Sequence, residues 1–165
     1  MCHHLAPQTY ELCSKSMLGT LSIIGLNVSR TLPPAPAPYV LSRAEGGSSG
    51  NFIVVKFHDY GQPCDVQAVH SILELAQMFA YTEDPKKPLD PEIPMHFEEP
   101  HRMRMDLYPS FETEMTWGQW RLVLDCLFEF VEKWRMVNLS FEVREIGYVI
   151  RGKKLGEGLI SNYLG

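Results

Sequence analysis

The C-terminal third of the chain carries the pattern that most constrains its fold. Thr116 is followed three residues later by Gln119, a pairing that caps the first turn of a helix and satisfies two backbone donors. Over residues 117–135, apolar side chains then recur around most of the helix circumference, so this helix packs on more than one side. Residues 138–144 alternate polar and apolar side chains, as a half-buried strand does. We therefore expect a long buried helix that leads into a sheet.

Three further segments have the patterns of strands. Residues 52–57 are β-branched and aromatic, which is typical of a central strand. Residues 102–108 alternate cleanly, and this alternation predicts a second strand whose apolar side chains face the core. Residues 155–160 are expected to form the last strand, with Gly156 and Gly158 marking a bulge or a close approach of two backbones.

The remaining pattern completes an α+β fold in a single domain. Residues 66–80 have apolar side chains at helical spacing, and Asp65 is placed to cap this helix. The resulting order is β-α-β-α-β-β, for which we expect a mixed four-stranded sheet with both helices on one face and a polar open face opposite. Residues 83–100 contain five prolines, so they are expected to form a semi-rigid surface loop without regular structure.

Residues 1–50 differ in composition from the rest of the chain. Residues 33–38 are rich in proline, and residues 46–50 consist of glycine and serine. We therefore expect a linker there, followed by the α+β domain over residues 51–165. The short apolar run at residues 17–28 suits a secretory signal, which would make the protein secreted. A disordered tail on a cytoplasmic protein suits the same composition, and both interpretations stay open.

Charge and cysteine content exclude several classes of function. The 165 residues carry a net charge of −5, so a nucleic-acid-binding protein with a general affinity for phosphates is not expected. The apolar run is too short to span a membrane. Cys2, Cys13, Cys64 and Cys126 are widely spaced, so neither a zinc knuckle nor a disulfide-rich scaffold is indicated. A bridge between Cys64 and Cys126 would require an oxidising compartment.

The catalytic candidates surround the first strand-to-helix turn. They are His58, Asp59, Cys64 and His70. A thiol beside an imidazole that a carboxylate orients is the arrangement of a nucleophilic site. The alternative is a capped turn with His70 exposed on the polar side of its helix. The sequence leaves both interpretations open.

Two other patterns are weaker. Residues 147–153 have the glycine and lysine spacing of a phosphate-binding loop, but Lys154 stands where a magnesium-binding Ser or Thr is required. No helix follows, so we expect a hairpin turn there. Cys2, His3 and His4 are metal-ligating residue types without a scaffold to fix their geometry, and neither a metal site nor a cofactor is predicted.

Three short stretches give the chain a family likeness. Thr116-Trp117-Gly118, Phe141-Glu142-Val143 and Gly156-Glu157-Gly158 resemble the corresponding stretches of small uncharacterised fungal proteins, many of which have predicted secretion signals. The likeness in layout covers about residues 51–160. It implies no catalytic residues, and it favours secretion.

These patterns together favour a small non-enzymatic binding or interaction protein, of a secreted effector type if the signal is used. Its partner would be a protein or a small molecule, and the oligomeric state is not specified. The alternative is a small cofactor-free enzyme, such as an isomerase, cyclase or hydrolase, with a cleft between sheet and helix. A structural subunit is a third class, because an exposed Trp117, Trp120 or Trp134 would imply a partner surface.

Overall fold

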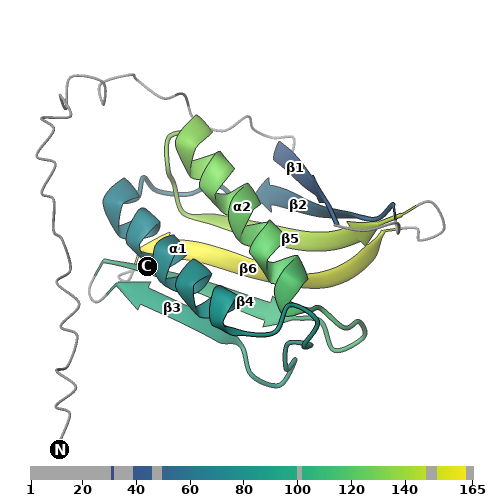
Figure 1. The fold of residues 1–165 in the computed structure, drawn as a ribbon. Helices are drawn as coiled ribbons and strands as arrows, with labels where there is room; N and C mark the ends of the chain where they lie inside the picture. Colours follow the sequence, from purple (N-terminus) through teal and green to yellow (C-terminus); the bar gives the residue numbers. More distant parts are fainter. Residues whose placement is uncertain (1–30, 32–38, 46–49, 100–101, 148–151, 163–165) are drawn as a thin grey trace, which may run out of the picture.

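The chain forms an α+β fold in which a six-stranded antiparallel sheet carries two helices on one face (Figure 1). The computed structural model describes residues 31, 39–45, 50–99, 102–147 and 152–162. The predicted α+β class and the two helices are confirmed. The predicted mixed four-stranded sheet is wrong, because two edge strands join it and every strand pair is antiparallel.

The two helices lie side by side across the sheet, whose strand order is β1-β2-β5-β6-β4-β3. In chain order the elements are β1 (Tyr39–Ala44), β2 (Phe52–His58), α1 (Val66–Thr82), β3 (Met95–Glu99), β4 (Met103–Pro109), α2 (Trp117–Lys133), β5 (Leu139–Ile146) and β6 (Lys153–Asn162). Among the described residues, neither helix combines the length and the hydropathy needed to cross a membrane.

Both helices begin at the residues that the capping patterns predict. The Asp65 carboxylate accepts hydrogen bonds from the backbone of Gln67 and Ala68, at 2.9 and 3.2 Å. At α2, the Gln119 backbone donates to the Thr116 hydroxyl at 3.3 Å, and the Gln119 side chain accepts from the Thr116 backbone at 2.9 Å. Local side chains therefore satisfy backbone donors that the first helical turn leaves unpaired.

The sheet starts earlier in the chain than the domain boundary expected near Asn51. β1 pairs along its whole length with β2, from Tyr39 opposite Phe57 to Ala44 opposite Phe52. Six residues between a proline tract and a glycine-rich segment carry only a weak strand pattern of their own. Pairing with the central strand β2 supplies the stabilisation that the local sequence lacks.

The proline-rich segment holds a strand, which corrects the prediction that residues 83–100 contain no regular element. β3 occupies the proline-free stretch Met95–Glu99 between Pro94 and Pro100 and pairs with β4. Proline is tolerated beside an edge strand because only one side of that strand needs its backbone donors. Five residues with no periodic context were too few to indicate the strand from sequence.

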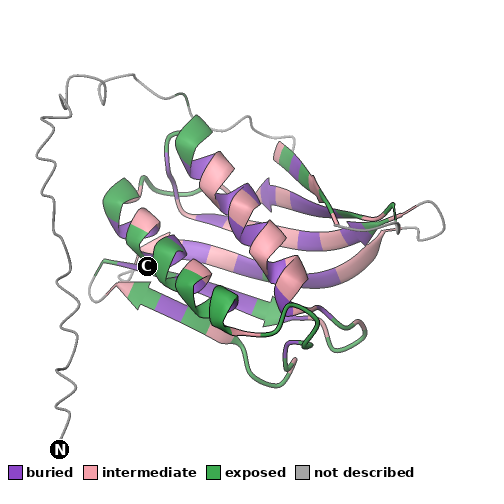
Figure 2. Cartoon of the chain, viewed as in Figure 1, coloured by how far each residue is buried: buried purple, intermediate pink, exposed green. Residues whose placement is uncertain are grey.

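The core lies between the sheet and the helices, and along β5 buried residues alternate with partly buried ones (Figure 2). Phe57 of β2 stacks on Phe130 of α2 with 4.2 Å between the ring centroids. The predicted inward-facing residues of β4 are buried, namely Met103, Met105 and Leu107. Trp117 and Trp120 are also buried and Trp134 is partly buried, so the tryptophans do not form an exposed partner surface.

Gly156 and Gly158 mark a close approach of backbones, as predicted. A Cβ atom on Gly158 would lie 2.3 Å from Cζ of Phe141 and 2.5 Å from the carbonyl oxygen of Asp106. A Cβ atom on Gly156 would lie 2.8 Å from the carbonyl oxygen of Tyr108. The predicted bulge is also present, since the β5–β6 register shifts between Val143 and Arg144.

We expect Gly158→Ala to lower the free energy of unfolding by about 1–3 kcal/mol, because the added methyl group overpacks the space beside Phe141. Urea denaturation of the variant and the wild type measures this difference. Phe141→Leu, alone and combined with Gly158→Ala, completes a double-mutant cycle. An unchanged unfolding midpoint in Gly158→Ala would contradict the close approach.

Candidate functional site

The face of the sheet opposite the helices is open and largely polar. Strand register arranges its side chains in rows that cross the sheet. One row contains Lys56, Glu142, Glu157 and Tyr108, and the next contains His58, Ser140, Leu159, Asp106 and His96. The alternation of β4 and β5 therefore produces the polar face that the sequence predicts.

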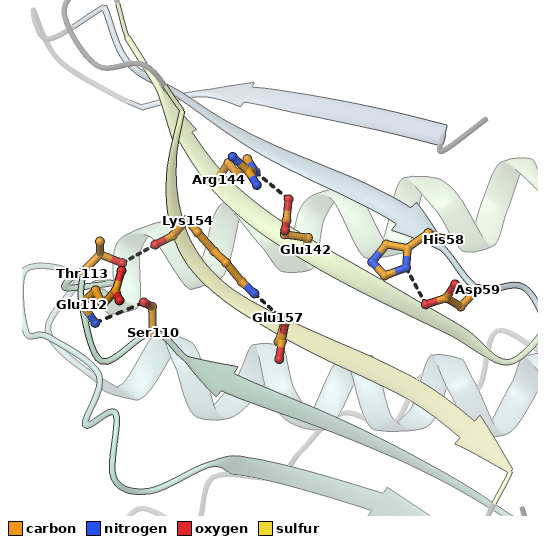
Figure 3. Close-up of polar contacts among 9 residues, drawn as sticks. All are labelled: His58, Asp59, Ser110, Glu112, Thr113, Glu142, Arg144, Lys154 and Glu157. Carbon is orange, nitrogen blue, oxygen red and sulfur yellow. Dashed lines mark hydrogen bonds and ion pairs between the residues drawn. The ribbon is translucent and has the colours of Figure 1, made fainter. Parts of the chain in front are cut away.

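Ion pairs hold the side chains in the middle of this face (Figure 3). Lys154 Nζ lies 2.6 Å from Glu157 Oε2, and Arg144 Nε lies 2.5 Å from Glu142 Oε1. The hydrogen bond from Arg144 lowers the pKa of the Glu142 carboxyl. Arg144 also donates to the carbonyl of Gly152 at 3.2 Å. The surface thus presents alternating charges in fixed positions, without a large field of one sign.

One carboxylate on the open face is buried, although the strand pattern places it on the wet side. Asp106 is only 6% exposed. His96 of β3 forms an ion pair with it through Nδ1, and Arg104 Nε lies 3.5 Å from its second oxygen. The hydrogen bonds to Asp106 and to Glu98 raise the pKa of His96. The neighbouring cations stabilise the charge that burial would otherwise disfavour.

A short loop after β4 carries the most exposed large apolar side chain of the described residues. We call residues 110–114 the Phe111 loop, because Phe111 at its tip is 77% exposed. The loop is anchored to β6: the Thr113 hydroxyl donates to the carbonyl of Lys154, and the Ser110 backbone donates to the carbonyl of Leu155 at 2.8 Å. Phe111 is therefore held out toward solvent by a fixed loop.

Two shallow grooves lie on either side of this loop. The first, of about 470 Å³, separates it from the proline-rich segment and is lined by Pro88, Leu89, Asp90, Pro91 and residues 110–114. The second, of about 400 Å³, reaches the open face and is lined by residues 108–112, Lys154, Gly156 and Glu157. Sequence reasoning missed this site, because no periodic pattern or motif singles out Phe111.

The predicted catalytic residues do not form one cluster. His58 Nδ1 and Asp59 Oδ2 lie 2.7 Å apart at the end of β2, where Asp59 adopts a left-handed conformation with φ 54°. The Cys64 thiol instead donates to Asn138 Oδ1 at 3.0 Å. His70 lies on α1 with its ring 6.1 Å from that of Phe128. Among the described residues, no hydrogen bond joins the Cys64 thiol to an imidazole.

The surroundings of Cys64 do not suit a nucleophile. Burial raises the pKa of this thiol to about 12, so it is protonated at neutral pH. Its hydrogen bond to Asn138 fits a structural role, because Asn138 also accepts from the backbone of Asn162 at 2.9 Å. Cys64 and Cys126 are both free thiols, and burial raises the pKa of Cys126 to about 11.

Other candidate motifs give no site in the part of the chain that the structure describes. No group of three or more His, Cys, Asp and Glu side chains there is arranged to hold a metal ion. Cys2, His3, His4, Cys13 and the signal-like run lie outside the described residues. The segment with phosphate-loop spacing is partly described, and β5 and β6 on its two sides pair as an antiparallel hairpin, as predicted.

Comparison with known proteins supplies no relative. No protein-family model, no curated protein and no solved structure matches this chain. The likeness to small fungal proteins therefore stays an expectation. Functional inference rests on the geometry of the chain itself.

We expect Cys64 to react with iodoacetamide at pH 8 at least about 100-fold more slowly than a cysteine in an unstructured peptide, because burial keeps the thiol protonated. Mass spectrometry of the peptide that contains Cys64 measures the rate separately from the other cysteines. In urea the same residue should react at the reference rate. Fast alkylation of the folded protein would restore Cys64 as a candidate nucleophile.

Proposed function

We propose that this chain is a small non-enzymatic binding protein that contacts its partner through the Phe111 loop and the adjoining open face. The observation that carries the proposal is the exposure of Phe111, which an anchored loop holds between two grooves. An exposed phenylalanine is costly in water, and such side chains commonly anchor protein interfaces.

The surroundings of Phe111 have the composition of an interface. Tyr108 is a second exposed aromatic residue and lines the groove on the open-face side. Charged side chains border this pair, with the Lys154–Glu157 ion pair on one side and Asp90 on the other. An apolar centre with a polar rim is the usual arrangement of a protein-binding surface.

The shape of the grooves favours a protein segment over a small molecule. Small-molecule sites enclose most of their ligand in a mainly apolar cavity. Here the grooves are shallow and share Ser110, Phe111 and Glu112, so they continue past one projecting side chain. A loop or an extended segment of a partner protein can contact both grooves at once. A secreted effector-type protein is one setting for such a surface.

We expect a photo-crosslinking amino acid in place of Phe111 to capture a discrete partner protein in the cells that make this chain, because residue 111 would lie inside the interface. The same amino acid in place of Tyr81, an exposed aromatic residue of α1, is the matched control. Phe111→Ala should then weaken binding of the identified partner at least about tenfold, with an unchanged circular dichroism spectrum. Identical products from both positions would refute the proposal.

The contact between His58 and Asp59 favours a second candidate, the small cofactor-free enzyme. A carboxylate 2.7 Å from Nδ1 can orient the imidazole and leave Nε2 as a general base. The His58 side chain is partly exposed, as a base that meets substrate must be. However, neither groove beside the Phe111 loop is lined by His58 or Asp59. This His58–Asp59 dyad therefore shares no groove with the Phe111 surface.

The two candidates make opposite predictions for His58→Ala. Under the binding proposal, crosslinking from position 111 should be unchanged, because His58 lies outside the Phe111 surface. Under the enzyme alternative, turnover found in a panel of ester, lactone and enolisable carbonyl substrates should fall at least about 100-fold. Asp59→Asn should reduce that turnover as well. Turnover that survives both substitutions would exclude this dyad.

A further inference from the structure

In the part of the chain that the structure describes, the outer side of β3 is an edge without a partner strand. β3 ends the sheet and pairs only with β4 among the described strands, and it forms the lower rim of the sheet in Figure 1. Unpaired edges expose backbone donors and acceptors that can accept a further strand. The chemistry of this edge depends on which backbone groups point outward.

Hydrogen bonding of β4 determines that direction. The backbone N–H of Ser110, just after β4, donates to β6 at Leu155. Backbone groups alternate in direction along a strand, so the even-numbered residues of β4 point to β6 and the odd-numbered ones point to β3. Met105, an odd-numbered residue, lies opposite Phe97 of β3. Phe97 therefore bonds to β4, and the backbone groups of its neighbours His96 and Glu98 point outward.

An apolar stripe of α1 borders the same edge. Leu75, Met78 and Phe79 are 47%, 70% and 49% exposed and follow the i, i+3, i+4 spacing of one helix face. Phe79 packs against Phe97 of β3, with 6.3 Å between the ring centroids. The sequence pattern places Phe79 with the buried residues of its helix, yet half of its surface faces solvent. Such a stripe beside an open strand edge marks an interaction surface.

We propose that β3 pairs with β3 of a second copy of this chain, antiparallel and about a two-fold axis through Phe97, so that two six-stranded sheets form one continuous sheet. In this register His96 of each copy lies opposite Glu98 of the other, and the outward backbone groups of both residues form hydrogen bonds. This inference concerns a different surface from the Phe111 loop and does not depend on the proposed binding function.

Charge and proline placement select this register among the antiparallel ones. Centring the axis on His96 would put two imidazoles opposite each other and pair Glu98 with Pro94, which has no N–H to donate. Centring it on Glu98 would oppose two carboxylates and pair His96 with Pro100. With the axis at Phe97, both cross-strand pairs combine a cationic and an anionic side chain, which is the favourable arrangement.

The electrostatics of a single copy support the charge pairing. The ion pair with Asp106 raises the pKa of His96, so the imidazole stays protonated to a higher pH than a free one. Glu98 already lies 3.2 Å from Nε2 of this imidazole, on the same open face. The two-fold axis also brings the α1 stripes of both copies to the same side of the sheet, where Phe79 lies next to the axis.

Amide hydrogen exchange on the full-length protein tests both the association and its register. We expect light scattering to give twice the monomer mass of 18.9 kDa at 100 μM protein. The amides of His96 and Glu98 should exchange at least about tenfold more slowly at that concentration than under dilution to monomer. The Phe97 amide is the internal control, because it bonds to β4 in both states.

Two surface variants separate the contributions of charge and apolar contact. Glu98→Lys places like charges opposite each other, and Leu75→Glu charges the α1 stripe, so each should raise the dimer dissociation constant at least about tenfold. Glu132→Lys, the same charge change at an exposed position on α2, which packs on the β1–β2 side of the sheet, should leave it nearly unchanged. A monomeric mass at 100 μM would overturn the proposal. Pro94 and Pro100, which flank β3 in the sequence, would then be read as residues that discourage pairing at this edge. A dimer whose His96 and Glu98 amides remain unprotected would overturn the proposal as well.

Discussion

Packing of α2 over the β1–β2 side of the sheet and beside α1 is the interaction on which the rest of the structure depends. Phe130 stacks on Phe57 of β2 and Trp120 is fully buried, so this helix and this side of the sheet share one core. Truncating such an aromatic side chain costs about 3–5 kcal/mol, which is a large share of the stability of a small domain. Because α2 is apolar around most of its circumference, it also requires α1 beside it.

Placing both helices on one face leaves the other face and the sheet edges to interact with solvent or partners. The open face carries ion pairs within single strands, among them Lys154 with Glu157 on β6 and Arg144 with Glu142 on β5. The exposed apolar side chains used in the two proposals lie elsewhere, in the Phe111 loop beside this face and along the α1 stripe on the helix side of the sheet.

β4 connects the two proposed interaction surfaces. Its C-terminal end leads directly into the Phe111 loop, and its side edge carries β3. The carboxylate of Asp106, at the centre of β4, holds His96 in place on β3. One strand therefore positions the loop that would contact a partner and the edge that would join a second copy. The two surfaces are separate, so both can be occupied at once.

Much of the fold could be predicted from contacts between residues that are close in the sequence. Caps at Asp65 and Thr116 and the periodicity behind them predict both helices, since these contacts form between residues a few positions apart. The glycines of β6 predict a close backbone approach for a similar reason: only a residue without Cβ fits there. These features depend on near neighbours, which a linear pattern records.

Strand pairing and the functional surfaces required the tertiary structure. β1 and β3 are short, and partners distant in the chain stabilise them, so their own residues carry little signal. The grouping of His58, Cys64 and His70 failed to appear because a shared turn in sequence does not bring side chains together in space. The exposure of Phe111 likewise depends on an anchor to β6, since solvent exposure is a property of the packed chain and not of any one segment.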